Sequence, residues 1–356
     1  MAKNQETKAT VESVDIANRE TEGLSQGQIV RRRFVRHKAA MISLFSLVGI
    51  IVFVFSASGL HFGTEKNPIS ITGWAKYSIT DLPELEYKSC PDGTTGCPTL
   101  DILPAFIDGT GVDIGDHPFG QDDLGRDYFS LVMRGAEQSV VVMLIIGIIA
   151  ALIGTVVGAV SGFFRGWTDA VLMRFTDFII TIPTIIIGSV MGFHFGNLGV
   201  GFLALFLGLF SWTGLSRLVR GEFLSLRERE FVDAARVAGA SNARIVFKHI
   251  LPNAVGVIIV SVTLLMSSAI LLETGLSYLG FGVVAPDVSL GSLISQYQDS
   301  FTTRPWLFWY PGLFIIAIAL CINFIGDGLR DAFDPRQKRR ITKKDRDAAQ
   351  TSKVGA

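Results

Sequence analysis

Two features of this 356-residue sequence could do chemistry: an acid at the end of an apolar run, and two closely spaced cysteines. Glu273 could line a transport pathway or contact a substrate, or it could be a hydrated acid at a membrane interface. Cys90 and Cys97 enclose a turn-rich stretch, and on an oxidising face such a pair predicts a disulfide. A metal site there is disfavoured, because two cysteines without nearby histidines lack the usual four ligands.

Catalysis by this chain is disfavoured by what the sequence lacks. No nucleophile and base stand in a recognisable arrangement. The dipeptide Gly-Lys is absent, so the phosphate-binding loop of ATPases is missing. Asp122, Asp123 and Asp127 could suggest a Ca²⁺ or Mg²⁺ site, but Arg126 lies among them and acids at a helix start explain the pattern as well. We expect no catalytic residue, metal or cofactor in this chain.

The composition predicts an integral membrane protein. Hydrophobic residues make up 49% of the chain and charged residues 18%, with a mean hydropathy of +0.43, whereas soluble proteins carry about 25% charged residues. The 32 basic residues balance the 32 acidic ones, so net charge points to no nucleic acid and to no polyanionic ligand.

Six apolar segments could each cross a bilayer, which takes about 20 helical residues. The third and fourth are joined only by a short stretch around 196–199, and are predicted as a tight helical hairpin or as helices that extend further. We therefore predict an all-α membrane protein with six transmembrane helices. The segments are 39–60, 138–164, 178–195, 200–215, 254–272 and 306–325.

Basic residues predict the orientation, because they remain on the cytoplasmic side. They cluster before the first span, between the fourth and fifth spans and in the C-terminal tail, so both termini are predicted to be cytoplasmic. The first span is predicted to stay as an anchor, since its apolar run of about 22 residues exceeds the roughly 7–15 of a signal peptide. Residues 29–35 fit either an amphipathic helix on the inner surface or a plain basic flank.

The resulting organisation has a small extracytoplasmic insertion between the first two helices and one large inner loop, 216–253. The predicted parts are a cytoplasmic tail and interfacial helix (1–38), the first span (39–60), the insertion (61–136), a core with the other five spans (137–336) and a second cytoplasmic tail (337–356).

The inner loop has the most specific pattern. Apolar and alanine residues recur with helical spacing as far as Ala238; Gly239 can take the left-handed conformation beyond a helix end, and Ser241 can cap a second helix. Pro252 marks the return to the membrane. Two short helices with an exposed turn suit docking in the groove of a partner. The alternative is an amphipathic loop that lies on the bilayer.

These residues resemble the membrane subunits of ABC importers, whose pattern is Glu-Ala-Ala, three residues, Gly, nine residues, Ile-x-Leu-Pro. Here an aspartate replaces the glutamate, and His249 replaces the isoleucine. The resemblance implies that the turn 238–241 belongs to a coupling helix in a cleft of an ATPase subunit. The residues it assigns to ATPase coupling are Asp233, Ala234, Ala235, Ala238, Gly239, Ala240, Ser241, Leu251 and Pro252.

Segments 117–127, 273–282 and 326–331 narrow the resemblance to the C-type permease of bacterial oligopeptide and dipeptide importers. The resemblance covers most of 29–336 and implies a type I ABC importer permease fold in the cytoplasmic membrane. It also implies four kinds of partner: a second, B-type permease, two ATPase subunits that bind ATP and Mg²⁺, an extracytoplasmic substrate-binding protein and the lipid bilayer. The insertion is longer than expected for the family, and its role is open.

The predicted function is therefore one half of a pore for oligopeptides or dipeptides, with nickel or glutathione as alternative substrates. A secondary carrier is disfavoured because ionisable residues are nearly absent from the spans. A receptor or scaffold would leave the glycine faces of the spans unexplained. These glycines recur at every fourth position: Gly154, Gly158, Gly162 and Gly166, and Gly188, Gly192 and Gly196.

Overall fold

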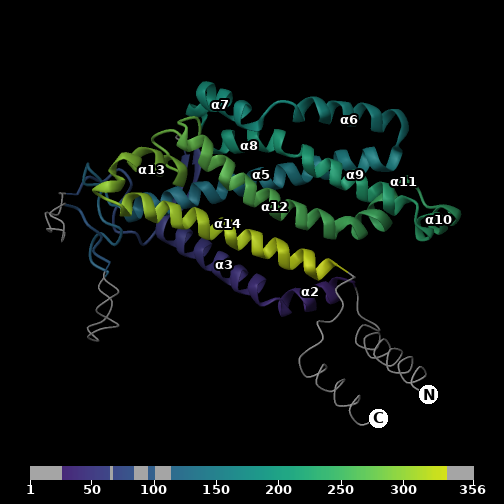
Figure 1. Ribbon diagram of the computed structural model, residues 1–356, viewed down its shortest axis with the longest axis horizontal. Coiled ribbons are helices and arrows are strands. Elements are labelled where there is room, and N and C mark those ends of the chain that lie inside the picture. Colours follow the sequence, from purple (N-terminus) through teal and green to yellow (C-terminus); the bar gives the residue numbers. More distant parts are fainter. Residues whose placement is uncertain (1–25, 65–66, 84–94, 101–113, 335–356) are drawn as a thin grey trace, which may run out of the picture.

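The computed structural model describes residues 26–64, 67–83, 95–100 and 114–334. Within these residues, helices run side by side along one long axis and form an elongated bundle (Figure 1). The helical fold is confirmed, apart from one short hairpin of two strands.

Four helical stretches of the described chain are long and apolar enough to cross a membrane. They are α3 (Lys38–Ser58), α5 (Tyr128–Phe164), Asn242–Tyr278, which ends in α12 (Leu251–Tyr278), and α14 (Trp306–Phe333).

The third and fourth predicted spans are bent helix pairs. In the first pair, α6 (Gly166–Ile180) meets α7 (Thr184–Phe195) at 68°. Pro183 lies in this bend, and proline disfavours a helical conformation in the residue before it, which ends α6. In the second pair, α8 (Val200–Ser211) meets α9 (Thr213–Arg227) at 40°. The described chain thus has four spanning helices, or six if each bent pair is one span.

The helix that contains the second predicted span, α5, begins well before residue 138. Asp127 caps this helix: its carboxylate accepts a hydrogen bond of 2.9 Å from the backbone N–H of Ser130. Such a cap satisfies an N–H group that lacks a partner within the helix. Residues 128–136, predicted as the end of the insertion, therefore belong to α5.

The predicted glycine face of α5 is the contact surface for α9. A Cβ atom added to Gly158 would lie 2.5 Å from the backbone oxygen of Ser216, and one added to Gly162 or Gly154 would lie 2.7 or 3.0 Å from the nearest atom of α9. Small residues let two helix backbones approach in this way. Gly166 differs, because it has no atom within 4 Å and takes a φ of +58° at the start of α6.

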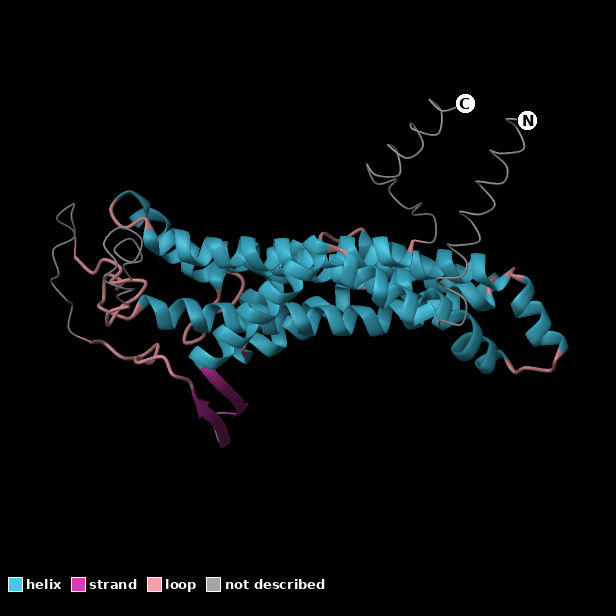
Figure 2. Cartoon of the chain, turned by 90° about the horizontal axis from the view of Figure 1, so that it is seen from below, coloured by secondary structure: helices cyan, strands magenta, loops and turns pink. Residues whose placement is uncertain are grey.

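One end of the bundle carries the strands β1 (Gly59–Thr64) and β2 (Asn67–Thr72), which pair antiparallel and project from the bundle (Figure 2). Ile69 and Ile71 alternate with polar residues in β2, a pattern typical of strands. The helices α13 (Leu290–Tyr297) and η3 (Gln298–Thr302) lie at the same end.

The other end carries the N-terminal helix and the elements of the inner loop (Figure 1). These elements are α2 (Gln26–Arg36), α10 (Glu230–Val237), α11 (Asn242–Arg244) and η2 (Ile245–Ile250).

A separate short helical turn, η1 (Gly196–Leu198), joins α7 to α8.

Candidate functional site

The predicted inner loop begins as a helix. α9 extends to Arg227, so the first part of the 216–253 loop continues the bent span, and the separate elements start at α10. Glu230 and Asp233 lie in the first turn of α10, where acids are favourable beside the positive end of the helix dipole. Asp233 also forms an ion pair of 2.9 Å with Arg236, one turn further along.

The turn after α10 is the one that the sequence predicts. Gly239 has a φ of +78°, and the backbone N–H of Ala240 donates to the carbonyl of Ala235 at 3.0 Å. The N–H of Gly239 donates to the carbonyl of Arg236 at 2.9 Å. These two bonds make a Schellman motif, in which glycine supplies the left-handed residue. The conformation of Gly239 is therefore confirmed.

The second helix of the loop joins α12 without a break. The hydroxyl of Ser241 caps it by accepting a bond of 3.4 Å from the N–H of Arg244. The chain then passes through the π-helical turn η2 into α12, where Pro252 occupies the first turn. Because Pro252 has no N–H to donate to the preceding turn, it fits where the hydrogen-bond pattern changes from π-helical to α-helical.

Buried side chains attach the loop to the bundle. Val232 and Ala235 of α10 and Ile245 and Ile250 of η2 share one apolar cluster with residues of α5 and α9, including Phe223. Because packed interiors deform little, a displacement of the loop would also displace the parts of α5 and α9 that share this cluster.

The tip of the loop is exposed, and most of it consists of small residues. Of the residues predicted for ATPase coupling, Asp233, Ala234, Ala238, Gly239, Ser241 and Pro252 are exposed, Ala240 and Leu251 are half-buried, and Ala235 is buried.

Val237 at this tip was missed by the sequence prediction. Its side chain is 90% exposed at the end of α10. It lies off the apolar repeat of α10, and that departure was the available signal. An exposed apolar side chain among small residues suits contact with a protein partner.

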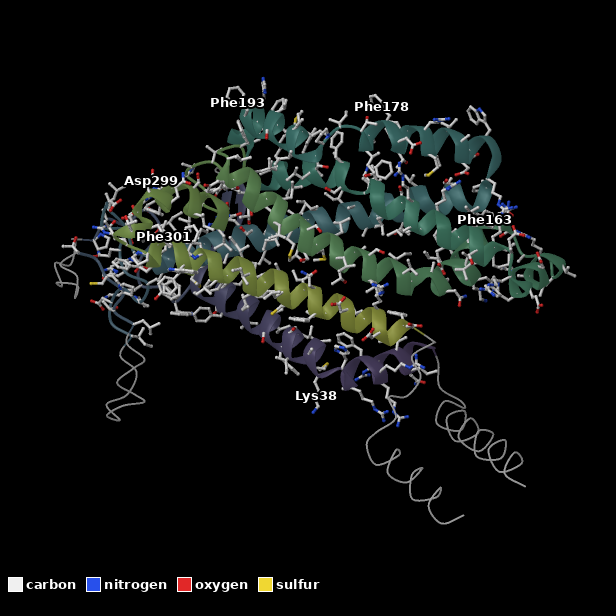
Figure 3. The ribbon with its side chains drawn as sticks, viewed as in Figure 1. Lys38, Phe163, Phe178, Phe193, Asp299 and Phe301 are labelled. Atoms are coloured by element: carbon white, nitrogen blue, oxygen red, sulfur yellow. The ribbon has the colours of Figure 1, made fainter. Side chains whose placement is uncertain are left out.

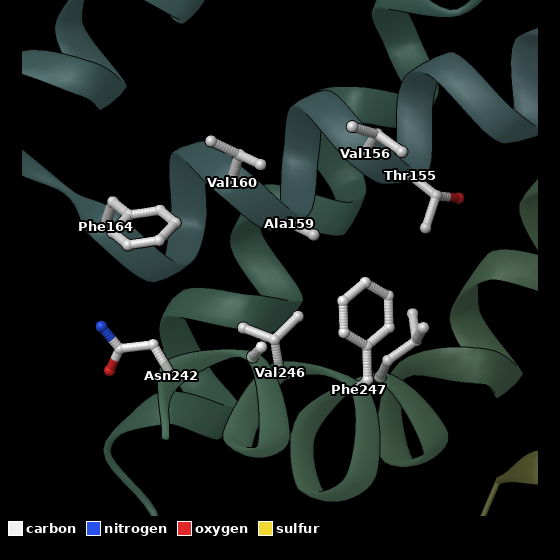
Figure 4. Close-up of a pocket in the computed structure, with 10 residues that line it drawn as sticks. Thr155, Val156, Ala159, Val160, Phe164, Asn242, Val246 and Phe247 are labelled. Carbon is white, nitrogen blue, oxygen red and sulfur yellow. The ribbon is translucent and has the colours of Figure 1, made fainter.

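A groove of about 260 Å³ lies between α5 and the second helix of the loop (Figure 4). Val156, Val160 and Phe164 face Val246 and Phe247 across it. The lining has no charged side chain, so the groove has no cation to neutralise the phosphates of a nucleotide.

At the opposite end, the acids of the 117–127 segment have structural roles. The carboxylate of Asp122 pairs with Arg126 at 2.6 Å and accepts a bond of 2.8 Å from the hydroxyl of Tyr297. Burial raises the pKa of this tyrosine. Asp127, the cap of α5, lies 3.0 Å from the Nδ1 of His117. The segment forms a turn before α5, in which the backbone N–H of Gly125 donates to the carbonyl of Asp122 at 3.2 Å.

Glu273 is neither hydrated nor at an accessible surface of this chain. It is 0% exposed, and its carboxylate accepts hydrogen bonds from the hydroxyls of Ser139 (2.9 Å) and Ser277 (2.7 Å). The interpretation as a hydrated interfacial acid is therefore wrong, and a role in the transport pathway stays a prediction. The neighbours that cover it come from α5, from its own helix and from Ser289 before α13, and their closeness could not be read from its position along the chain.

The cysteines divide into two kinds. Cys97 is disulfide-bonded, whereas Cys90 lies outside the described residues, so the pairing of the two stays a prediction. Cys321 is free and buried in α14.

Comparison with known proteins places the chain in a family. Residues 154–339 match the family model for the binding-protein-dependent transport system inner membrane component. Residues 25–70 match the N-terminal transmembrane domain of oligopeptide transport permease C.

Named relatives match nearly the whole chain. The oligopeptide transport system permease protein OppC of Mycobacterium tuberculosis is 36% identical over 319 residues, which cover 89% of this chain and 97% of the relative. OppC of Escherichia coli K12 is 38% identical over 320 residues, covering 90% and 94%. An inward-facing structure of the MetNI methionine ABC transporter has 20% identity and a TM-score of 0.48, and covers 57% of this chain and 96% of that one.

The family match covers more than half of the chain, and the relatives share well over 30% of their residues with it. Members of this family are transmembrane components of ABC importers, in which separate subunits hydrolyse ATP. The chain belongs to the binding-protein-dependent transport system inner membrane component family, as a non-catalytic permease subunit of the inner membrane.

Proposed function

We propose that this chain forms one half of a pore that imports oligopeptides or dipeptides. The observation that carries the proposal is the similarity to two oligopeptide permeases over 89–90% of the chain. Nickel and glutathione, the alternative substrates, have no such support among these relatives.

The other half of the pore would be a B-type permease. Two ATPase subunits would bind ATP and Mg²⁺ on the cytoplasmic side, and an external binding protein would deliver the peptide. Both termini and the inner loop would then be cytoplasmic, which agrees with the basic residues of α2, Arg31, Arg32, Arg33 and Arg36, at the same end as α10. The tip of the inner loop supports contact with an ATPase subunit, because its small residues permit close approach and Val237 offers an apolar anchor.

The inner loop would act as the lever between ATP and the pore. Closure of the ATPase subunits would displace α10 and the turn around Gly239. Because Val232 and Ile245 are buried against α5 and α9, the displacement would rock these helices and open the pore outward. This is rigid-body coupling between two states.

The first experiment is a pull-down of the tagged chain in mild detergent, with mass spectrometry and an ATPase assay. We expect a second permease, ATPases and a binding protein, and ATPase activity that peptides stimulate through the binding protein. Nickel and glutathione serve as competing substrates. Recovery of a lone chain, or stimulation by nickel or glutathione but not by peptides, would contradict the proposed function.

A further inference from the structure

Helix α6 has little apolar attachment to the rest of the bundle. Only Thr176 and Ile179 of this helix are buried. Trp167 is 81% exposed, and Phe178 is 66% exposed and points away from the bundle (Figure 3). A helix with so few buried contacts needs other interactions to fix its position.

Three ion pairs supply that attachment, and all of them lead to α9 or to the residue that follows it. We call them the ion-pair ladder. Arg220 holds Asp169 through two bonds of 2.6 Å each, a geometry that fixes direction as well as distance. The other two pairs are Arg217 with Asp177 at 2.5 Å and Arg165 with Glu228 at 2.8 Å.

The pairs follow the antiparallel order of the two segments. Arg165 precedes α6 and meets Glu228 after α9; Asp177, near the end of α6, meets Arg217, near the start of α9. The ladder therefore extends along most of α6. Its Arg220–Asp169 pair is the most buried of the three, and since exposed ion pairs contribute little, this pair contributes most to the register of α6 on α9. The hydroxyl of Ser161 in α5 also donates to Asp169, which adds a link to the central helix.

The α9 side of the ladder is continuous with the coupling loop. Only Glu228 and Arg229 separate α9 from α10. Arg227 at the end of α9 donates to the backbone carbonyl of Phe163 in α5 and lies 5.7 Å from the centre of its ring. Since α9 also rests on the glycine face of α5, α9 and the loop form one packed unit.

The other end of α6 adjoins the bend at Pro183. Beyond it, α7 is attached to a different part of the bundle: Gly188 lies against Leu276 of α12, and Gly192 lies against the backbone of Phe281. The two halves of this bent span are thus held by different neighbours, α6 by charges on α9 and α7 by close packing on α8 and on the outer end of α12.

We propose that the ion-pair ladder transmits the movement of the coupling loop to α6. In this mechanism α6 moves with α9, while α7 stays on α8 and α12; the bend at Pro183 and the 40° bend between α8 and α9 absorb the difference. The six charged residues of the ladder are positioning residues for transport. The inference rests on the proposed function, since it takes the loop to be driven by ATPase subunits.

The test uses charge exchange in the complete importer, reconstituted in proteoliposomes with tritiated tripeptides to pentapeptides as substrate. Asp169→Arg should lower the number of peptides imported per ATP hydrolysed by about two- to thirtyfold, the range that residues on a coupling route contribute. ATPase activity should change little. The double exchange Asp169→Arg with Arg220→Asp should restore the ratio. The pair Asp177→Arg with Arg217→Asp is a second, more exposed set in case the first variants do not fold.

Distances between spin labels provide a readout that a purely structural role would not affect. Helix shifts in such transitions are about 1–2 Å. Labels at Trp167 on α6 and at the exposed Leu218 on α9 should therefore keep their separation within ~2 Å between the nucleotide-free and ATP-trapped states. The separation between labels at Trp167 and at Phe193 on α7 should change by more than ~2 Å.

The inference is overturned if transport and ATPase activity fall together in the single exchanges, if the double exchange restores nothing, or if α6 separates from α9 on ATP trapping. Gly239→Trp in the same assay distinguishes failure of the proposed role of the loop from failure of the proposed role of the ladder. If this loop variant transports normally, the proposed role of the loop fails; if it is inactive while the ladder variants stay fully coupled, only the ladder fails.

Discussion

Replacement of Gly158 by alanine should force α5 and α9 apart. The new Cβ would lie 2.5 Å from the oxygen of Ser216 and 2.7 Å from the Cβ of Val219, whereas ordinary contact begins near 3.4 Å. One of these atoms belongs to the backbone, so no side-chain rotation relieves the clash and the helices must separate by about 1 Å. Overpacking of this kind costs about 1–3 kcal/mol of unfolding free energy.

The matched control is Gly49→Ala in α3, because Gly49 is exposed and has no atom within 4 Å. Alanine improves helix propensity by about 0.5–1 kcal/mol in both variants, so their difference isolates the overpacking. We expect Gly158→Ala to be less stable than Gly49→Ala by about 1–3 kcal/mol when the purified chain is unfolded with SDS in detergent micelles. Equal stability of the two variants would refute the close contact between α5 and α9.

Three further changes test separate parts of the structure. Val237→Glu should weaken binding of the ATPase subunits by about tenfold or more, the loss typical of an interface anchor, whereas Val237→Ile should leave binding unchanged. The yield of co-purified ATPase subunits measures this, and equal yields from both variants would contradict the prediction. Ser139→Ala removes one hydroxyl that binds buried Glu273 and should lower the unfolding free energy in SDS by about 1–3 kcal/mol. Ser268→Ala removes an exposed hydroxyl and should not lower it. Equal losses in the two variants would contradict the role of Ser139 in stabilising Glu273. Burial raises the pKa of Tyr297, so the folded state holds the phenol proton more tightly than the unfolded state, and stability should fall as pH rises above about 10. Tyr297→Phe should reduce this loss of stability, measured by thermal unfolding between about pH 9 and 11. An unchanged pH profile would contradict the role of the Tyr297 phenol.

The sequence predicts most of the fold because its strongest signals are local. Apolar runs of spanning length identify the long helices, and the glycine spacing of α5 identifies the face on which α9 packs. The turn at Gly239 is predictable for the same reason, since a left-handed residue, a following serine cap and the end of an apolar repeat all lie within a few positions.

Features that depend on distant residues could not be predicted. The burial of Glu273 requires Ser139 from another helix, and the attachment of α6 requires Arg217 and Arg220 to meet two aspartates some 40 to 50 positions earlier. The early start of α5 was missed because residues 128–136 include Arg134, whose charge interrupts an apolar run without ending the helix.

The most direct test of the central claim is peptide uptake by the reconstituted importer with Gly239 replaced. Gly239→Asn keeps a residue that tolerates the left-handed conformation at φ +78°, whereas Gly239→Trp places a bulky side chain at the exposed turn. We predict ATP-driven uptake near the wild-type rate for asparagine and none for tryptophan, with both variants inserted equally; Asp233→Lys should behave like the tryptophan variant. Wild-type uptake by Gly239→Trp and Asp233→Lys would contradict the claim that this loop couples ATP hydrolysis to transport.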